Sequence, residues 1–559
     1  MSVLQAVLAD LAASVHQGVA AAAAAGVLPE VPDTLTVPLT PPPDPALGDF
    51  ATPVAMSLAR GMGRSPQAVA EAIAARVGTA GGRISRVDVA APGFINFHLD
   101  PAWLADVVAE VLTAGPDYGR CNLGEGQRVS VEYVSANPVG PMTVVQARAG
   151  AFGDTLAKVL ATCGYQVTRE YYVNDAGNQI YEFAASVAAR LRELGSGEPA
   201  EIPPGGYPGE YVRDVARAVA EGYRERLAEL APPERLEFLA EVAPQAMVDL
   251  QRQELASYGV EFDLWTSQRQ LLASGAPRRA VATLKAAGYT YEAQGALWFA
   301  ATTFGDDKDR VIIRSNGVPT YFTSDIAYHQ AKLERADHVI DIVGPDHQGW
   351  IRWMRAVMAA LDVPADRFEV IIVQHLRLLR GGQPVRHSKR AGELVTLSDI
   401  VTEVGRDATR YFFLSRAASS HLDFDLTLAA TKSQENPAYY VQYAHARIAS
   451  LLARAEATGY PTVGSPDLTL LTDPAERSLM RRLADWPEEV RLAAAGREVQ
   501  RLAYYATDVA RLFHGFYDTC RALDQPAPLG SARLALARAT RQVLQLVLGH
   551  MGIAAPDHM

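Results

Sequence analysis

The alternation of hydrophobic and polar residues predicts a parallel sheet in the middle of the chain. Two runs, RVSVEYV at 128–134 and YQVTREYYV at 165–173, alternate in the manner of buried strands and are rich in β-branched and aromatic residues. The Ala-rich stretch between them, 143–163, has the apolar spacing of a helix. Strand, helix and strand in this order predict a βαβ unit that opens a parallel sheet. Further strand-like runs follow at RVIIRS, HVIDIVG and FEVIIVQH.

The same pattern divides the rest of the chain into three regions. Residues 1–110 contain two helical runs, a Pro-rich linker and two strand-like runs, ISRVDVA and GFINFHL, which predict a small α+β domain. Residues 111–429 form the sheet domain, with a mostly helical insertion near 182–290. Nearly everything in 430–559 has helical spacing, which predicts an all-α bundle. A chain of 559 residues is too long for one core, so several domains are expected.

Composition narrows the class of protein. The three cysteines, Cys121, Cys163 and Cys520, show no C-x-x-C spacing, so the sequence predicts neither a metal site nor a disulfide framework. No run approaches ~20 uninterrupted apolar residues, and the N-terminus lacks a basic leader. The tract AAAAAG is expected to be a helix with a Gly stop. We therefore expect a cytoplasmic protein that does not bind membranes.

The net charge of −11 argues at first against a nucleic-acid partner. The charge is unevenly distributed, because residues 430–559 carry 14 Arg and Lys against 13 Asp and Glu. A near-neutral, Arg-rich C-terminal region beside an acidic body is compatible with RNA binding through local patches. Arginines on the solvated faces of helices explain the same composition without any RNA.

The first stretch with candidate chemistry is SANPVGPMTVVQARAG at 135–150, directly after a predicted strand. In an open parallel sheet, ligands bind beyond the carboxyl ends of strands where the strand order reverses. Ser135 and Asn137 offer polar groups for a small zwitterion, and the amides that open the following helix offer an anion site. A simple Pro/Gly turn that closes a strand is the alternative.

The second stretch is LLRGGQPVRHSKRAGELVTLSDI at 378–400. Only six of the 52 basic residues are lysines, so Lys389 does not reflect a general use of lysine. A Gly-flanked loop that carries Arg386, Ser388 and Lys389 suits a polyphosphate whose charge grows as pyrophosphate departs. A solvated basic turn is the alternative.

The third stretch is YFTSDIAY at 321–328. Tyr321 and Asp325 lie four residues apart and share a face if the stretch is helical. An aromatic ring and a carboxylate on one face suit a cationic side chain. A helix N-cap by Ser324 or Asp325 explains the same residues without a ligand.

Together these stretches resemble one family, the arginyl-tRNA synthetases, which form a group of class I synthetases. The resemblance runs through nearly the whole chain. It is carried by GDFATPVAMSLAR, GFINFHL, VEYVSANPVGPM, YYVNDAGNQI, RSNGVPTYFTSDIAYH, GPDHQGW, SKRAGELVTLSDIV, HLDFDL, ENPAYYVQYAHARI, LAYYATDVARLFHGFYDTCRAL and MGIAAPDHM.

The resemblance implies a Rossmann-type catalytic domain that joins arginine to its tRNA through an arginyl-adenylate, with ATP and Mg²⁺. The N-terminal domain would contact the tRNA, and the helical C-terminal domain would bind the anticodon. By position, Ser388, Lys389 and Arg386 would serve the ATP phosphates. The arginine pocket would be formed by Glu132, Ser135, Ala136, Asn137, Tyr321, Asp325 and His347. Candidate tRNA contacts are Tyr439, Tyr440, Tyr443, His445, Tyr504 and Tyr517, although core packing explains such aromatics equally well.

The chain departs from the family pattern at two signatures. Where the family carries a HIGH-type sequence, commonly His-Val-Gly-His, this chain has TVVQ at 143–146. Thr143 and Gln146 keep one donor each, and Val145 places a branched side chain where adenine approaches the backbone. The KMSK-like loop also differs, with Arg386 and His387 in place of Lys and Met. Loss of one transition-state donor typically costs about 3 kcal/mol.

Three functions remain open at this level. The leading one is arginine–tRNA ligation by an enzyme that works as a monomer and does not bind DNA. The alternative is a catalytically impaired paralogue that binds tRNA without charging it. A third is another α/β nucleotidyl-transferring enzyme, which would not need the helical C-terminal domain.

Overall fold

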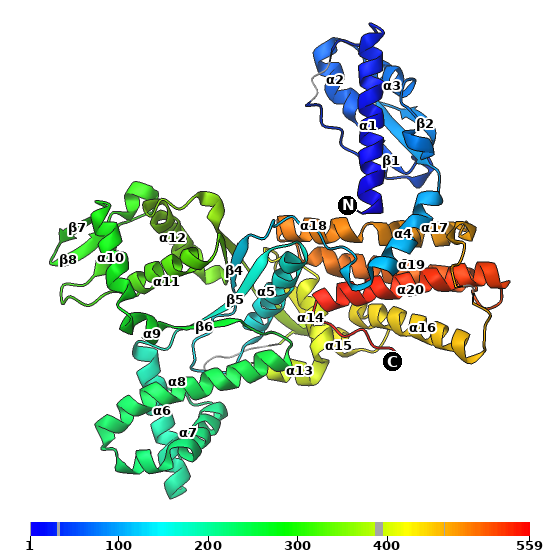
Figure 1. Cartoon of the computed structure of the whole chain (residues 1–559). Helices are drawn as coiled ribbons and strands as arrows, with labels where there is room; N and C mark the ends of the chain where they lie inside the picture. The colour runs from blue at the N-terminus through cyan, green and yellow to red at the C-terminus, as the bar shows by residue number, and fades with distance from the viewer. Residues whose placement is uncertain (1, 31–33, 386–394, 463) are drawn as a thin grey trace.

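A computed structural model of the chain describes residues 2–30, 34–385, 395–462 and 464–559. The N-terminal part packs helices against a three-stranded antiparallel sheet of order β1-β3-β2 (Figure 1). Its strands are β1 (Phe50–Thr52), β2 (Ile84–Ala90) and β3 (Phe94–Leu99). Its helices are α1 (Val3–Ala24), α2 (Val54–Met62) and α3 (Pro66–Ala74).

Helix α1 contains the apolar tract noted in the sequence. It is long and apolar enough to cross a membrane by length and composition, but Val7, Leu11 and Val15 on one face are buried in this domain's core. The chain leaves the helix at Gly26, whose φ of +65° is a left-handed conformation that favours glycine. The predicted helix with a Gly stop is therefore confirmed.

The centre of the molecule is a five-stranded parallel sheet of order β11-β10-β4-β5-β6. The strands are β4 (Arg128–Glu132), β5 (Gln166–Val173), β6 (Leu264–Ser267), β10 (His338–Val343) and β11 (Phe368–Ile372). Helix α5 (Val144–Thr162) connects β4 to β5, which confirms the predicted βαβ unit. The chain adds β5 on one side of β4 and later β10 on the other, so the strand order reverses at β4.

A helical unit interrupts the sheet between β5 and β6 and extends away from the rest of the molecule (Figure 1). It consists of α6 (Asn178–Ser196), α7 (Glu210–Glu229) and α8 (Pro232–Ser257), which share their own apolar core. The range predicted for the insertion, 182–290, also contains β6, a strand of the parallel sheet. Because β6 is only four residues long, its alternation was too short to distinguish it from its helical surroundings.

A second small layer follows β6. It contains the antiparallel sheet β7-β8-β9 and a separate apolar core with its neighbouring helices. The strand-like run RVIIRS becomes β9 in this sheet, not a strand of the parallel sheet. The elements are α9 (Gln268–Ala273), α10 (Ala276–Ala286), β7 (Thr290–Ala293), β8 (Ala296–Phe299), β9 (Arg310–Ile313), α11 (Tyr321–Arg335) and α12 (Gln348–Ala360).

After β11 the chain crosses to the helical C-terminal region. The connecting elements are β12 (Leu376–Arg380), β13 (Gln383–Pro384), α13 (Leu397–Val404), α14 (Arg406–Leu414), β14 (Leu422–Asp425) and α15 (Leu426–Ala430). The bundle consists of α16 (Pro437–Ala457), α17 (Pro474–Ala484), α18 (Trp486–Gly496), α19 (Gln500–Thr519) and α20 (Ala527–His550). Helix α4 (Ala102–Ala114), which spans residue 110, packs on α17 and α20.

Arg410 joins the sheet domain to the end of the bundle. Its guanidinium is fully buried, donates to Asp154 Oδ2 of α5 at 2.5 Å and donates to the Met551 carbonyl at 2.7 Å. Gly552 has a φ of +67°, and a Cβ there would come within 2.5 Å of that guanidinium. Three segments far apart in sequence therefore depend on one buried charge pair.

We expect Arg410→Met to lower the free energy of unfolding by up to about 3–5 kcal/mol, because the buried Asp154 carboxylate then keeps only the partly exposed Lys158 as a counter-charge, 2.8 Å away. Denaturant unfolding followed by tryptophan fluorescence measures the change. The matched control is Arg377→Met, which breaks the pair with Asp423, whose side chains are 62% and 51% exposed, and should cost less than about 1 kcal/mol. Equal losses in the two variants would contradict a special role for Arg410.

Candidate functional site

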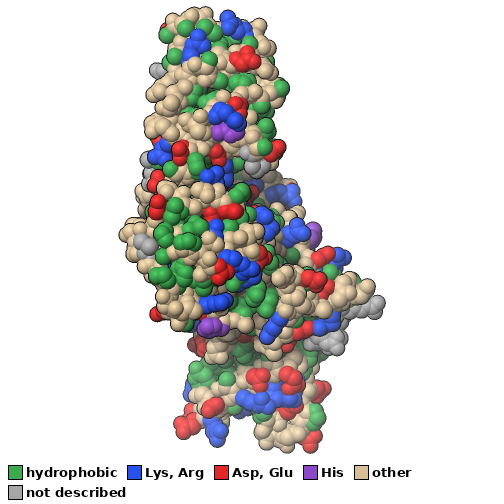
Figure 2. All heavy atoms as spheres, turned by 90° about the vertical axis from the view of Figure 1, so that its right-hand side faces the viewer, with side chains coloured by type: hydrophobic (Ala, Val, Ile, Leu, Met, Phe, Trp, Pro, Cys, Tyr) green, Lys and Arg blue, Asp and Glu red, His purple; other side chains and the backbone are tan. Residues whose placement is uncertain are grey.

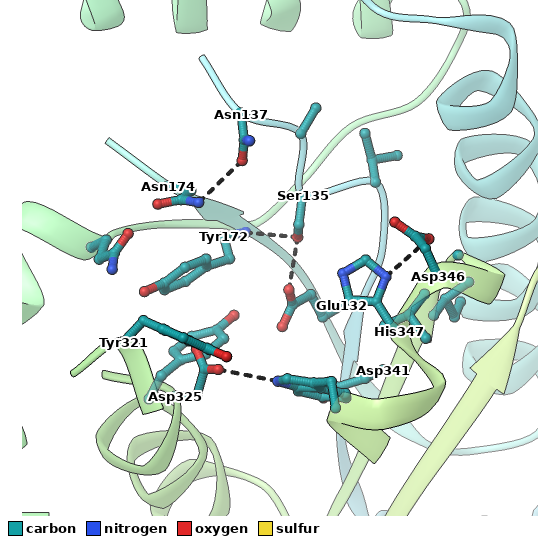
Figure 3. Close-up of a pocket in the computed structure, with 18 of the residues that line it drawn as sticks. Glu132, Ser135, Asn137, Tyr172, Asn174, Tyr321, Asp325, Asp341, Asp346 and His347 are labelled. Atoms are coloured by element: carbon teal, nitrogen blue, oxygen red, sulfur yellow. Dashed lines mark hydrogen bonds and ion pairs between the residues drawn. The ribbon is translucent and has the colours of Figure 1, made fainter. Parts of the chain in front are cut away.

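A cavity of about 1700 Å³ opens where the carboxyl ends of β4, β10 and β11 meet the start of α5. This is the place where the strand order reverses, and it is where parallel sheets of this kind bind ligands. Each of the three stretches singled out in the sequence contributes described residues to the cavity lining. Figure 3 shows part of this lining (Figure 3).

The loop after β4 is held in a conformation that side chains rarely adopt. Val134 and Ser135 have φ values of +70° and +40°, which are unfavourable for residues other than glycine and especially for a β-branched one. Ser135 Oγ donates to Glu132 Oε1 at 2.8 Å and accepts from the Tyr172 amide at 3.0 Å (Figure 3). The hydroxyl therefore fixes the loop between two strands.

Ala136 and Asn137 continue this loop. The Ala136 amide and carbonyl both bond to the Tyr171 hydroxyl, each at 3.1 Å. Asn137 Nδ2 donates to Gln179 Oε1 at 2.9 Å, and Asn137 Oδ1 accepts from Asn174 Nδ2 at 3.2 Å. The loop thus presents Ser135, Ala136 and Asn137 to the cavity from a backbone that neighbouring side chains support.

The start of α5 forms another side of the cavity. Thr143 is the N-cap residue, and its amide donates to Gln146 Oε1 at 2.7 Å. One of the amides expected to face a ligand is therefore bonded by a side chain of the same helix. Thr143, Val145 and Gln146 all line the cavity.

Arg148 fixes the next turn of α5 against the far side of the cavity. Its guanidinium is almost fully buried and donates to the carbonyls of Gln374, Ala417 and Ser420 at 2.7, 3.0 and 2.9 Å. Burial lowers the pKa of Arg148 to about 10, since these neighbours are neutral carbonyls. The side chain positions α5 and does not reach the ligand space.

Tyr321 and Asp325 lie on α11, which begins at Tyr321 with Thr320 as its N-cap residue. The alternative of an N-cap at Ser324 or Asp325 is therefore excluded. Both side chains face the cavity, and Asp325 Oδ2 accepts from Trp350 Nε1 at 3.1 Å (Figure 3). Burial, reinforced by the negative charges of Glu132 and Asp341, raises the pKa of Asp325 to about 6.

The inner end of the cavity has an excess of negative charge. Glu132, Asp325 and Asp341 all line it, and the ammonium group of Lys332 lies buried behind them. Such a site disfavours anions and favours a cation that hydrogen-bonds to the carboxylates. His347 lies at the rim, where its Nδ1 is 3.3 Å from Asp346 Oδ1 and its side chain is 50% exposed.

Several cavity residues were not predicted from the sequence. Tyr172 and Tyr328 place their rings 4.5 Å apart, and their hydroxyls are buried with no hydrogen-bond partner among the described residues. Trp350 and Asn174 also line the space. For Tyr172 and Asn174 the available signal was the run YYVN at 171–174, where the second strand ends, because adjacent parallel strands end at the same edge of a sheet.

Arg386, Ser388 and Lys389 lie outside the described residues. Helix α13, which follows them, begins close to the cavity, since Val395 lines it and the Leu397 amide donates to the Met142 carbonyl at 2.8 Å. Among the residues that the structure describes, no group of three or more His, Cys, Asp and Glu side chains forms a metal site.

The helical domain carries a cluster of aromatic side chains between α16 and α19. Tyr443 lies with its ring 6.2 Å from Tyr439 and 5.8 Å from His514, and Tyr440 is 4.9 Å from the same histidine. Arg447 lies 3.9 Å above the Tyr517 ring. We call these six residues the α16/α19 cluster, and all of them are partly exposed.

Two other predicted tRNA contacts differ sharply in exposure. Tyr504 is 52% exposed on α19. His445 is fully buried and its Nδ1 lies 2.8 Å from the Pro556 carbonyl, so its predicted contact with tRNA does not fit the structure. The helical spacing that places it beside the tyrosines in sequence turns its side chain toward the C-terminal segment. Figure 2 shows basic and acidic side chains interspersed on the side of the molecule that carries this domain (Figure 2).

Comparisons with known proteins cover the chain from end to end. Three family models match consecutive parts: "Arginyl tRNA synthetase N terminal domain" over 9–99, "tRNA synthetases class I (R), catalytic domain" over 107–413, and "DALR anticodon binding domain" over 441–559. The arginine–tRNA ligase of Symbiobacterium thermophilum is 46% identical over 98% of both chains, and that of Moorella thermoacetica is 45% identical over 100% of both.

Solved structures agree with these relatives. A Campylobacter jejuni chain described as an arginyl-tRNA synthetase superposes with a TM-score of 0.74 at 32% identity, and the match covers 82% of this chain and all of that one. The Thermus thermophilus arginyl-tRNA synthetase also has a TM-score of 0.74, at 22% identity over 98% of this chain and all of that one, which shows the shared fold.

Proposed function

The chain belongs to the arginyl-tRNA synthetase family, and on that premise we propose how its cavity and its helical domain share the reaction. The reaction is the ATP-dependent ligation of L-arginine to its tRNA via arginyl-adenylate, with release of AMP and pyrophosphate. Nothing in the comparisons favours a paralogue that binds tRNA without charging it. The observation that carries the assignment of the cavity is its acidic inner end.

Arginine is proposed to bind with its guanidinium at Asp325 and Tyr321. An ionised carboxylate accepts guanidinium hydrogen bonds, and the Tyr321 ring covers the flat cation. The α-amino and carboxyl groups would then meet Ser135, Ala136 and Asn137, with Glu132 and His347 on either side. All these residues line one cavity, which supports the proposal.

ATP is proposed to lie across the start of α5. The positive end of the helix and the side chains of Thr143 and Gln146 would face its phosphates, and Arg386, Ser388 and Lys389 would close over them. Mg²⁺ would be held through the phosphates, as is common for this ion. It remains a prediction that the protein is a monomer and that it is cytoplasmic. It also remains a prediction that it binds neither DNA nor membranes.

Asp325→Asn should weaken arginine binding by about 1.5–3 kcal/mol and leave ATP binding unchanged, because a charged hydrogen bond is lost. Isothermal titration of the full chain with L-arginine measures the change. The matched control is Asp346→Asn at the cavity rim, whose side chain is 78% exposed, and it should shift arginine affinity less than about twofold.

The proposed contact between Asp325 and the guanidinium group should make arginine affinity depend on pH. Only the ionised carboxylate pairs with guanidinium, and the pKa of Asp325 is raised to about 6, so arginine affinity should be full above pH ~7 and fall as pH drops through 6. The fall should approach tenfold per pH unit below the pKa, and Asp325→Asn should flatten it. A wild-type affinity that stays constant from pH 7 to 5 would remove Asp325 from the guanidinium site.

The α16/α19 cluster is proposed to stack on anticodon bases, with Tyr504 as a further contact on α19. Tyr443→Ala should weaken tRNA binding by about 1–3 kcal/mol, the cost of losing one stacked base. Filter binding at fixed salt measures this loss. Tyr291→Ala is the matched control, because that side chain is 42% exposed on β7, at the opposite end of the molecule. An equal loss in both variants would contradict the assignment.

The altered signature at 143–146 is tested by restoring the family residues. Thr143→His, Val145→Gly and Gln146→His together should raise kcat for tRNA charging about a hundredfold with tRNA affinity unchanged, because added transition-state donors act on turnover. Val145→Gly alone, which adds room but no donor, should lower KM for ATP and leave kcat nearly constant. No gain from the triple variant would mean that other groups already supply these donors.

A further inference from the structure

Three carboxylates, two of them buried and the third partly exposed to the cavity, stand side by side across the parallel sheet. Glu132 of β4 pairs in register with Glu170 of β5 on one side and with Asp341 of β10 on the other. Neighbouring strands lie about 4.8 Å apart, so like charges at one level repel one another strongly in a buried setting. Glu170 and Asp341 are 0% and 2% exposed, which leaves little water to screen them.

Helix α11 supplies the opposite charges from one face. Lys332 donates to Glu132 Oε2 and, at 2.6 Å, to Asp341 Oδ1, and Arg335 donates to both oxygens of Glu170. His329 Nε2 lies 2.7 Å from Asp341 Oδ2. Burial alone would raise the pKa of Asp341, but Lys332 and His329 outweigh it and lower the pKa to about 2.

Lys332 is connected to the arginine loop through Glu132. One oxygen of Glu132 accepts from Lys332 and the other accepts from Ser135 Oγ at 2.8 Å. Ser135 and its neighbour Val134 have the positive φ values that need external support. The Lys332 ammonium is fully buried, lies 4.4 Å from the Tyr328 ring centre and does not line the cavity.

We propose that Lys332 is a positioning residue for arginine binding, which holds Glu132 so that the Ser135 loop keeps its strained conformation. This inference rests on the proposed arginine pocket. Lys332 acts without touching the ligand, because its ammonium does not line the cavity and pairs with Glu132, which does. Arg335 neutralises the same row of carboxylates through Glu170, but among the described residues it makes no hydrogen bond or ion pair with Glu132 or with the loop.

The pair of α11 cations allows a matched experiment on the full chain. Lys332→Met should weaken L-arginine binding in isothermal titration by at least about tenfold and leave ATP affinity within about twofold. Arg335→Met should lower the melting temperature and shift arginine affinity less than about twofold. Steady-state charging should show the Lys332→Met defect in KM for arginine more than in kcat. Equal loss of arginine affinity in both variants, or none in Lys332→Met, would overturn the proposal.

A second comparison covers the case in which Lys332→Met does not fold. The double variant Glu132→Gln, Lys332→Met removes one charge of each sign and should bind arginine as Glu132→Gln alone does, within about twofold. A further loss in the double variant would show that Lys332 does not act through Glu132. If the unmodified chain failed to bind arginine at all, the proposed pocket and not the positioning role would be refuted.

Discussion

Three carboxylates held at one level of a parallel sheet are the constraint on which the geometry of the cavity depends. Glu170, Glu132 and Asp341 come from adjacent strands, and their charges are balanced by one face of α11. The same helix carries Asp325 into the cavity, so the element that neutralises the sheet also supplies the carboxylate proposed for guanidinium. A buried site with more acidic than basic groups has a built-in preference for a cationic ligand.

Helix α5 connects the cavity to the helical C-terminal domain. Its first turn borders the cavity, Arg148 anchors the next turn to three carbonyls, and Asp154 pairs with Arg410 beside the C-terminal segment. The sheet domain and the helical domain share one continuous apolar core around this helix. The helical domain and the sheet domain that carries the cavity are therefore one packed body, not two loosely tethered units.

The Thr143 amide at the start of α5 can either be capped by a side chain of its own helix or donate to a bound phosphate. Gln146 uses its carbonyl oxygen to cap the Thr143 amide, an interaction that stabilises the first turn of a helix. The Thr143 N–H is then used within the helix, and the amide nitrogen of Gln146 stays available as a donor. A histidine at this position would give up the cap and offer a ring N–H in its place. At the proposed ATP site, the TVVQ sequence would thus give up one backbone donor in return for a capped helix end.

The sequence by itself determined the elements whose signals are local. The βαβ unit at 128–173, the helical C-terminal region and the shared face of Tyr321 and Asp325 follow from periods of two and 3.6 residues. Only the tertiary structure decided that Lys332 meets Glu132, 200 positions away, that His445 faces inward, and that β6 joins the parallel sheet. These depend on strand order and on which side of a helix packs, and both are set by burial across the whole chain, which no short window of residues contains.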